Sequence, residues 1–194
     1  MPDPVKRAHS RRVLSLLALM FLAPLGFAFW LYYGTQWRPP GGTNHGELIT
    51  PARPINRTIS DRIFAGKWSL VVIADGTCDA TCQQTLVYAR QTWLALGRLE
   101  SRTQRVWLAT ANCCDHGYVE REHPGLRVVD LMSSESMPGN SRSELLALFP
   151  DADQARQIFI VDPLGNLMMR YDTQLDPKGL RDDLNRLLDL SRIG

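Results

Sequence analysis

The longest apolar segment of the chain lies near its N-terminus. Residues 13–33 (VLSLLALMFLAPLGFAFWLYY) are 21 consecutive residues without a charged side chain, and a helix of about 20 residues crosses a hydrocarbon core of about 30 Å. Basic residues precede the segment, and Trp30, Tyr32 and Tyr33 gather at its far end like an interfacial belt. We therefore expect a single uncleaved transmembrane anchor with residues 1–12 in the cytoplasm; a cleaved signal peptide is the alternative.

The segment after the anchor has no sustained periodicity. Residues 34–60 contain four prolines and four glycines, a composition typical of loops. We expect a tether with little regular structure here, followed by one folded domain over residues 61–194.

Three patterned segments open this domain. Ser69–Ala74 (SLVVIA) is a continuous apolar run typical of a buried strand. Gln83–Arg98 carries apolar residues at helical spacing, and Arg105–Thr110 (RVWLAT) is a second strand candidate. Strand, helix and strand predict a βαβ unit with parallel strands and a right-handed crossover.

The second half of the domain predicts a hairpin and a closing helix. Ile158–Val161 and Leu167–Tyr171 flank a Pro/Gly turn. Asp176 is a candidate N-cap before Pro177, and the following leucines form one apolar stripe. With a short apolar run at 126–131 and a helix candidate at 141–149, this order predicts a thioredoxin-like α/β domain, a central mixed sheet flanked by helices, behind one N-terminal transmembrane helix.

The distribution of charged residues argues against one class of function, nucleic-acid binding. The formal net charge is +2, and four basic side chains lie within the first twelve residues, so the remainder is close to neutral. Without a basic surface, nucleic-acid binding loses its main electrostatic driving force. We expect no nucleic-acid partner.

Cys78 and Cys82 lie between the first strand and the first helix, beyond the membrane segment, where disulfides persist. If helical geometry begins near Cys78, the two residues share one face, close enough for a disulfide or a shared metal ion. A helix N-terminus favours thiolates, and two thiolates select Cu(I) over hard cations, although Zn is possible. The flanking Asp75 and Asp79 would oppose the thiolate. A purely structural disulfide is the alternative.

Cys113 and Cys114 follow the second strand. Because parallel strands end at the same edge of a sheet, all four sulfurs can meet there. The pair could be a second dithiol that exchanges electrons with the first, could supply metal ligands together with His116, or could be structural. His116 and His123 lie in a polar loop that we expect to be exposed, and Met168 and Met169 we expect to pack in the core.

This pattern resembles the SCO family of membrane-anchored, thioredoxin-fold proteins that deliver copper to, and reduce, the cysteines of the binuclear copper centre of cytochrome c oxidase. The resemblance covers about residues 60–190 and rests on the anchor, the strand before the C-x-x-x-C of Cys78 and Cys82, and the segment 158–165 (IFIVDPLG). It implies that Cys78 and Cys82 are the redox and copper residues.

The chain also departs from the family pattern. The family has prolines after both cysteines, where this chain has Asp79 and Gln83. The family's third copper ligand is a histidine shortly before the late strand, which here falls near Gln154, and no histidine follows His123. His116, or the second cysteine pair, would have to replace it.

We therefore expect a bacterial inner-membrane protein, held in the bilayer by residues 13–33, with its C-terminal domain in the periplasm. It would support respiratory oxidase assembly through Cys78 and Cys82, as a thiol-disulfide oxidoreductase, a Cu(I) carrier or both. Its partner would be an oxidase subunit or another assembly factor. The alternatives are a non-catalytic membrane scaffold with structural disulfides, and a thioredoxin-superfamily peroxidase, for which Thr77 is the one supporting residue.

Overall fold

The computed structural model forms two compact units, residues 1–42 and 43–194. The described residues are 4–34, 44–64, 66–135, 137, 140–151, 155–174 and 176–194.

The first unit is built around helix α1 (Pro4–Gly34), which contains Pro24. Its part Arg12–Gly34 contains an 18-residue window with a mean hydropathy of 2.2 and is long and apolar enough to cross a membrane. The predicted span is therefore helical, and it can serve as a single-pass anchor.

The described residues of the second unit form a six-stranded mixed sheet of order β1-β6-β5-β2-β3-β4. β2, β3 and β4 are parallel, whereas β5 and β6 are antiparallel to their neighbours. This confirms the predicted βαβ unit, the hairpin and the fold class. The strands are β1 (Glu47–Pro54), β2 (Trp68–Ala74), β3 (Thr103–Ala109), β4 (Leu126–Asp130), β5 (Gln157–Val161) and β6 (Asn166–Asp172).

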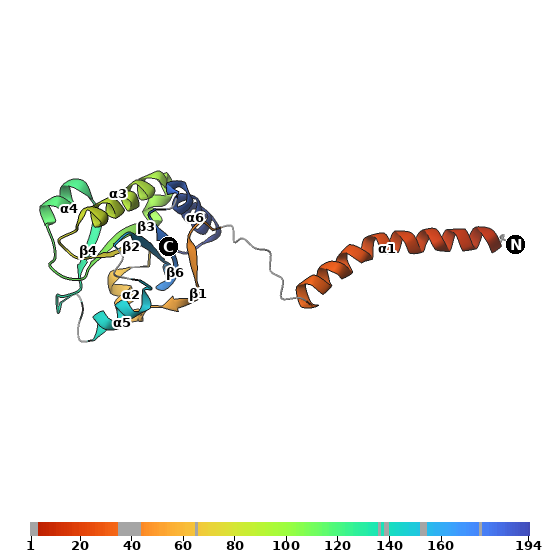
Figure 1. Cartoon of the computed structure of the whole chain (residues 1–194), viewed down its shortest axis with the longest axis horizontal. Helices are drawn as coiled ribbons and strands as arrows, with labels where there is room; N and C mark the ends of the chain where they lie inside the picture. Colours follow the sequence, from red (N-terminus) through yellow and green to blue (C-terminus); the bar gives the residue numbers. More distant parts are fainter. Residues whose placement is uncertain are drawn as a thin grey trace. The chain divides into compact units, whose positions relative to one another are not determined.

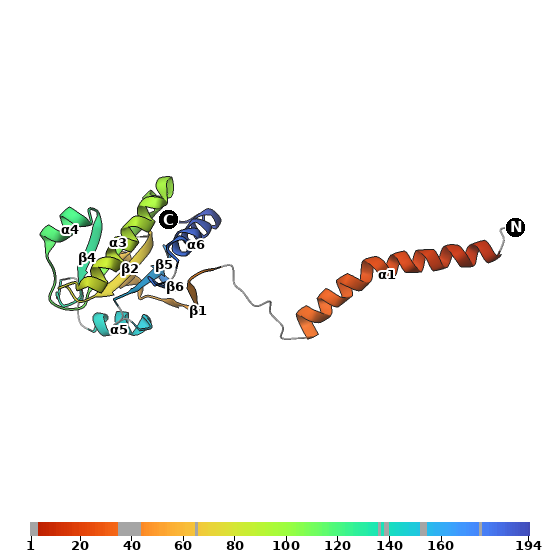
Figure 2. The ribbon, with the colours of Figure 1, turned by 45° about the horizontal axis from the view of Figure 1, so that its top comes forward.

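Helices cover both faces of this sheet (Figures 1 and 2). α3 and α6 pack with one buried apolar cluster, and α2 and α5 pack with the other. The helical segments are α2 (Arg57–Ile63), α3 (Ala80–Ala95), the 3-10 helix η1 (Gly97–Arg102), α4 (His116–Glu122), α5 (Ser141–Leu148) and α6 (Pro177–Leu190).

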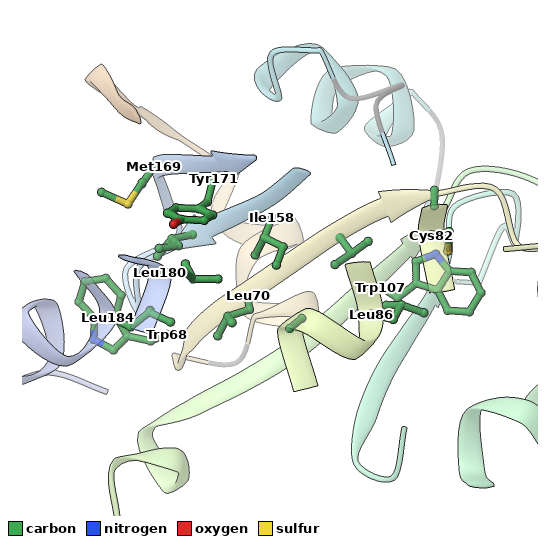
Figure 3. Packing of buried hydrophobic residues seen from close by; sticks show 14 of the residues in the cluster. Trp68, Leu70, Cys82, Leu86, Trp107, Ile158, Met169, Tyr171, Leu180 and Leu184 are labelled. Atoms are coloured by element: carbon green, nitrogen blue, oxygen red, sulfur yellow. The ribbon is translucent and has the colours of Figure 1, made fainter. Parts of the chain in front are cut away.

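The alternation of side chains along β2 divides the core. Leu70 and Val72 belong to the cluster under α3 and α6, whereas Val71 and Ile73 belong to the opposite cluster. All residues of β2 are buried, which explains its continuous apolar run. Figure 3 shows the first cluster, in which Trp107 of β3 lies near Cys82 and Leu86 of α3. Helix α3, which carries Cys82, is thus held on the sheet by this cluster.

The structure corrects the predicted tether. β1 lies within residues 34–60, pairs with β6 as an edge strand, and is followed by α2. Two prolines concealed this strand in the sequence, yet an edge strand tolerates proline because one side needs no ladder donors. Residues 35–43 lie outside the described residues.

The first described residues of the second unit are also hydrogen-bonded to α6. The carboxylate of Asp183, which is buried in α6, accepts hydrogen bonds from the backbone N–H groups of His45 and Gly46 at 2.8 and 2.9 Å. The ring Nδ1 of His45 lies 3.1 Å from the same carboxylate. His45, predicted to be part of the tether, therefore belongs to the folded unit.

Candidate functional site

The first cysteine pair lies at the carboxyl end of β2, in the turn that leads into α3. The predicted start of this helix was Gln83, but it begins at Ala80 because the side chain of Asp79 caps it, accepting a hydrogen bond from the N–H of Cys82 at 2.9 Å. Cys78 therefore precedes the helix, with a positive φ of 45°. Cys82 lies in the first helical turn.

Cys78 and Cys82 form a disulfide with a Cα–Cα distance of 5.1 Å. Both residues are buried, with exposed fractions of 5% and 1%. Cys82 nevertheless lines a pocket of about 500 Å³ at the carboxyl edge of the sheet. The other lining residues come from the ends of β2 and β3, from α5 and from the approach to β5: Ala74, Asp75, Thr77, Asp79, Thr110, Leu146 and Ala155.

Two carboxylates control the charge beside this pair. Asp75 accepts hydrogen bonds from the N–H and the hydroxyl of Thr77 at 2.9 and 2.7 Å, and these bonds lower the pKa of Asp75. Asp79 accepts the bond from Cys82 described above. Negative charge at these positions disfavours a nearby thiolate and opposes the effect of the helix N-terminus. The disulfide is therefore favoured over the dithiolate by local electrostatics.

The second cysteine pair lies on the neighbouring loop, as the topology predicted. Cys113 and Cys114, which follow β3, form a disulfide with each other. Both are partly buried and pack against the cluster that contains Cys78 and Cys82. The two pairs thus share one edge of the sheet and one apolar environment.

The predicted metal ligands are not assembled into one centre. His116 is exposed at the first position of α4. Within the part of the chain that the structure describes, no three His, Cys, Asp or Glu residues are grouped so that they could hold a metal ion, and all four cysteines form disulfides. The expected ligand position near Gln154 lies outside the described residues. A metal role for His116 stays a prediction.

A buried basic cluster under α4 was not predicted. His123 was expected to be exposed, but it is fully buried, and its Nε2 lies 3.2 Å from the hydroxyl of Tyr118. The guanidinium carbon of buried Arg105 lies 4.7 Å from the ring centroid of Trp93. Burial, followed by the charges of Arg105 and Arg90, lowers the pKa of His123. The polar local sequence concealed this burial, and the two arginines whose charges act on His123 come from β3 and α3.

The methionine prediction is confirmed. Met169 of β6 is 2% exposed and belongs to the main cluster (Figure 3), and Met168 packs against it.

Comparison with family models matches residues 68–191, more than half of the chain, to the family described as transmembrane-like, thioredoxin-like, C-terminal domain. The chain belongs to this family. This member of the transmembrane-like, thioredoxin-like family has no significant match among curated proteins.

Several solved structures share its fold. Apo Sco1 from Thermus thermophilus is 15% identical, with a TM-score of 0.53 over 77% of this chain and 98% of that chain. Copper-bound yeast Sco1 is 14% identical, with a TM-score of 0.52 over 78% and 96%. Copper-bound ScoI from Arabidopsis thaliana is 16% identical, with a TM-score of 0.51 over 65% and 86%. The predicted SCO resemblance is confirmed at the level of the fold.

Proposed function

We propose that this chain is a membrane-anchored thiol-disulfide oxidoreductase that reduces disulfides of partner proteins through Cys78 and Cys82. The observation that carries the proposal is the Cys78–Cys82 disulfide at the start of α3, with Cys82 lining a pocket of about 500 Å³. A structural disulfide needs no pocket beside it, whereas exchange requires that a partner's sulfur approaches it.

In the reduced protein, a thiolate of one cysteine attacks a sulfur of the partner disulfide. A mixed disulfide forms, and the partner's second sulfur leaves as a thiolate that takes up a proton. The other cysteine of the pair then loses its proton and attacks the mixed disulfide, closing the Cys78–Cys82 bond and releasing the second partner thiol. Two electrons and two protons pass to the partner. Asp75 and Asp79 favour this direction, because they disfavour the thiolates of the reduced pair.

We further propose a place and a partner for this reaction. The basic residues before the span favour a cytoplasmic N-terminus, and the C-terminal domain would then lie in the periplasm of a bacterial inner membrane. The partner would be a respiratory oxidase subunit or another factor of oxidase assembly, whose cysteines must be reduced before they bind metal. This proposal is supported by the SCO resemblance of the sequence and by the shared fold.

Cu(I) transfer is a second candidate, favoured by the soft donor character of two adjacent thiolates. The described residues supply these two donors and no third. Copper would therefore be a cargo of the reduced pair, and any closed three-ligand site would need a donor from another protein or from outside the described residues.

The test uses the full-length chain in detergent, with insulin as the disulfide substrate and dithiothreitol as the electron source. We expect Cys78→Ser/Cys82→Ser to slow catalysed insulin reduction at least about 100-fold. Gln84→Ser, an exposed position on the same helix, is the matched control and should leave the rate unchanged.

The same variants distinguish reductase from scaffold in cells. If cells whose only copy is Cys78→Ser/Cys82→Ser assemble an active oxidase at the normal level, the redox proposal is wrong and the scaffold holds. Titration of the reduced protein with Cu(I) against a chelator tests the second candidate: one copper bound by wild type and lost in Cys78→Ser supports it, and no competitive binding excludes it.

A further inference from the structure

The loops that carry the two cysteine pairs are in direct backbone contact. The N–H of Gly76 donates a hydrogen bond to the carbonyl oxygen of Ala111 at 2.7 Å. The side-chain amide of Asn112 donates a hydrogen bond to the carboxylate of Asp75 at 3.1 Å. Gly76 lies two residues before Cys78, and Ala111 lies two residues before Cys113. These bonds therefore hold the loop of one pair against the loop of the other.

Gly76 permits this contact because it has no side chain. A Cβ atom at this position would lie 2.5 Å from the Cα atom of Cys113 and 2.5 Å from the carbonyl oxygen of Asn112. Both are backbone atoms and cannot rotate away. The Cys113 backbone thus packs directly on the turn that leads to Cys78, and no side chain separates the two loops there.

The two pairs differ in their access to solvent. Cys78 and Cys82 are 5% and 1% exposed, whereas Cys113 and Cys114 are only partly buried. The pocket at Cys82 is lined by residues of the β2–α3 region and α5, by Thr110 after β3 and by Ala155 before β5, and Cys113 and Cys114 are not among them. A reductant can therefore approach the second pair without occupying the pocket in which a substrate would reach the first.

We propose that Cys113 and Cys114 form a second redox pair that passes electrons to Cys78 and Cys82 within the same molecule. This inference rests on the proposed reductase function and adds the route by which the buried pair is reduced. A dithiol protein would reduce the outer Cys113–Cys114 pair, the outer pair would reduce the inner Cys78–Cys82 pair, and the inner pair would reduce the substrate disulfide in the pocket.

The internal step is a balanced exchange. A thiolate of the outer pair attacks a sulfur of the Cys78–Cys82 disulfide, forming a bond between the pairs and releasing one inner thiolate, which takes up a proton. The second outer thiol then loses its proton and attacks this bond. The Cys113–Cys114 disulfide closes, and the second inner thiol is released. Two electrons and two protons move inward, and the external dithiol protein is the only reductant.

A trapping experiment tests whether the sulfurs reach each other. Four double variants of the full-length chain each keep one cysteine of each pair, for example Cys82→Ser/Cys114→Ser. In a glutathione redox buffer in detergent, we expect at least one of the four to form an intramolecular disulfide between the pairs, identified by peptide mass. If all four keep both cysteines unlinked to each other, the relay is overturned.

A kinetic experiment tests the direction of electron flow. Reduced thioredoxin is the protein reductant, dithiothreitol is the small one, and alkylation with mass detection reports the state of the inner pair. In Cys113→Ser/Cys114→Ser, we expect at least a tenfold slower reduction of the inner pair by thioredoxin, with reduction by dithiothreitol changed less than threefold.

The outcomes separate the relay from the proposed function. Equal rates with thioredoxin in wild type and variant, together with normal insulin reduction, would overturn the relay and leave the reductase function standing. An inner pair that resists excess dithiothreitol in the folded wild-type protein would overturn both.

Discussion

The two cysteine loops occupy equivalent places in the fold but have different supports. The first follows β2 and is continued by α3, a helix of 16 residues that packs on the main core. The second follows β3 and is continued by α4, a helix of 7 residues with one buried residue, Val119. Each helix is capped by an aspartate at its start, Asp79 and Asp115 respectively.

This difference shows that two features determine the surroundings of each cysteine pair: the place of its loop at the sheet edge, and the helix that follows the loop. The topology of parallel strands brings both loops to one edge of the sheet. The length of the following helix then decides how deeply each pair is buried, because only α3 covers a large apolar surface. One pair is thereby set beside a pocket, and the other is left within reach of solvent.

The contact between the loops should be most sensitive at Gly76. Gly76→Ala places a Cβ atom 2.5 Å from two backbone atoms of the other loop, and we expect a loss of about 2–3 kcal/mol in the free energy of unfolding. Denaturant titration of the full-length chain in detergent, followed by tryptophan fluorescence, measures it.

Gly97→Ala is the matched control for that substitution. Gly97 has a positive φ of 56° but no heavy atom within 4 Å of its Cβ position, so this change costs only backbone strain, about 1 kcal/mol. Equal losses for the two variants would show that the loops do not press on each other at Gly76.

The free energy of unfolding should depend on pH through His123, which follows the helix after the second loop. Because the folded-state pKa of His123 is lowered, the unfolded chain binds a proton that the folded chain does not. The free energy of unfolding therefore falls as the pH drops through about 6.5, with a slope of at most about 1.4 kcal/mol per pH unit from this group. We expect His123→Gln to remove this part of the slope between pH 7.5 and 5.5.

His116→Gln is the comparison for the pH measurement. His116 is the first residue of α4 and His123 directly follows its end, but His116 is exposed, and its replacement should leave the wild-type slope unchanged. If the free energy of unfolding of His123→Gln keeps the pH slope of the wild type, His123 is not the group that causes this slope.

Removing the charge of a capping aspartate should have the smallest effect. It should change the reduction potential of the neighbouring cysteine pair and leave that of the other pair unchanged. Asp79→Asn keeps an oxygen acceptor for the N–H of Cys82 but removes a negative charge beside the inner pair. We expect the reduction potential of Cys78–Cys82 to rise by about 10–30 mV, since the carboxylate is exposed and screened. Redox titration with mass-resolved alkylation measures each pair in the same sample.

Asp115→Asn makes the corresponding change on the second loop. It should raise the potential of Cys113–Cys114 and leave that of Cys78–Cys82 within error. If both variants shift both pairs equally, the charge effect does not distinguish the two loops.

Much of the fold follows from local sequence patterns. The apolar run of β2 and the leucine stripe of α6 belong to elements whose burial is visible in their own residues, and both were predicted with small errors at the ends. β1 was missed because its residues are mostly exposed and include prolines. Its structure comes from pairing with β6, which lies more than a hundred residues later in the chain.

The candidate site was predictable to the extent that topology determines it. The shared edge of the two cysteine pairs followed from the βαβ order alone. The role of Gly76 did not, because a close approach between loops leaves no periodic signal. His123 was expected to be exposed for a similar reason: its sequence neighbours are mostly polar, and nothing in that segment signals that the residue is fully buried.

The presence of two disulfides in one domain has a stoichiometric consequence. Each disulfide accepts two electrons, so a fully reduced molecule holds four. If the pairs communicate, a single reduced molecule mixed with excess disulfide substrate and no other reductant should release two equivalents of product, the second at the rate of internal exchange. The domain would then act as a small store of reducing equivalents, able to complete a second turnover before it meets its reductant again.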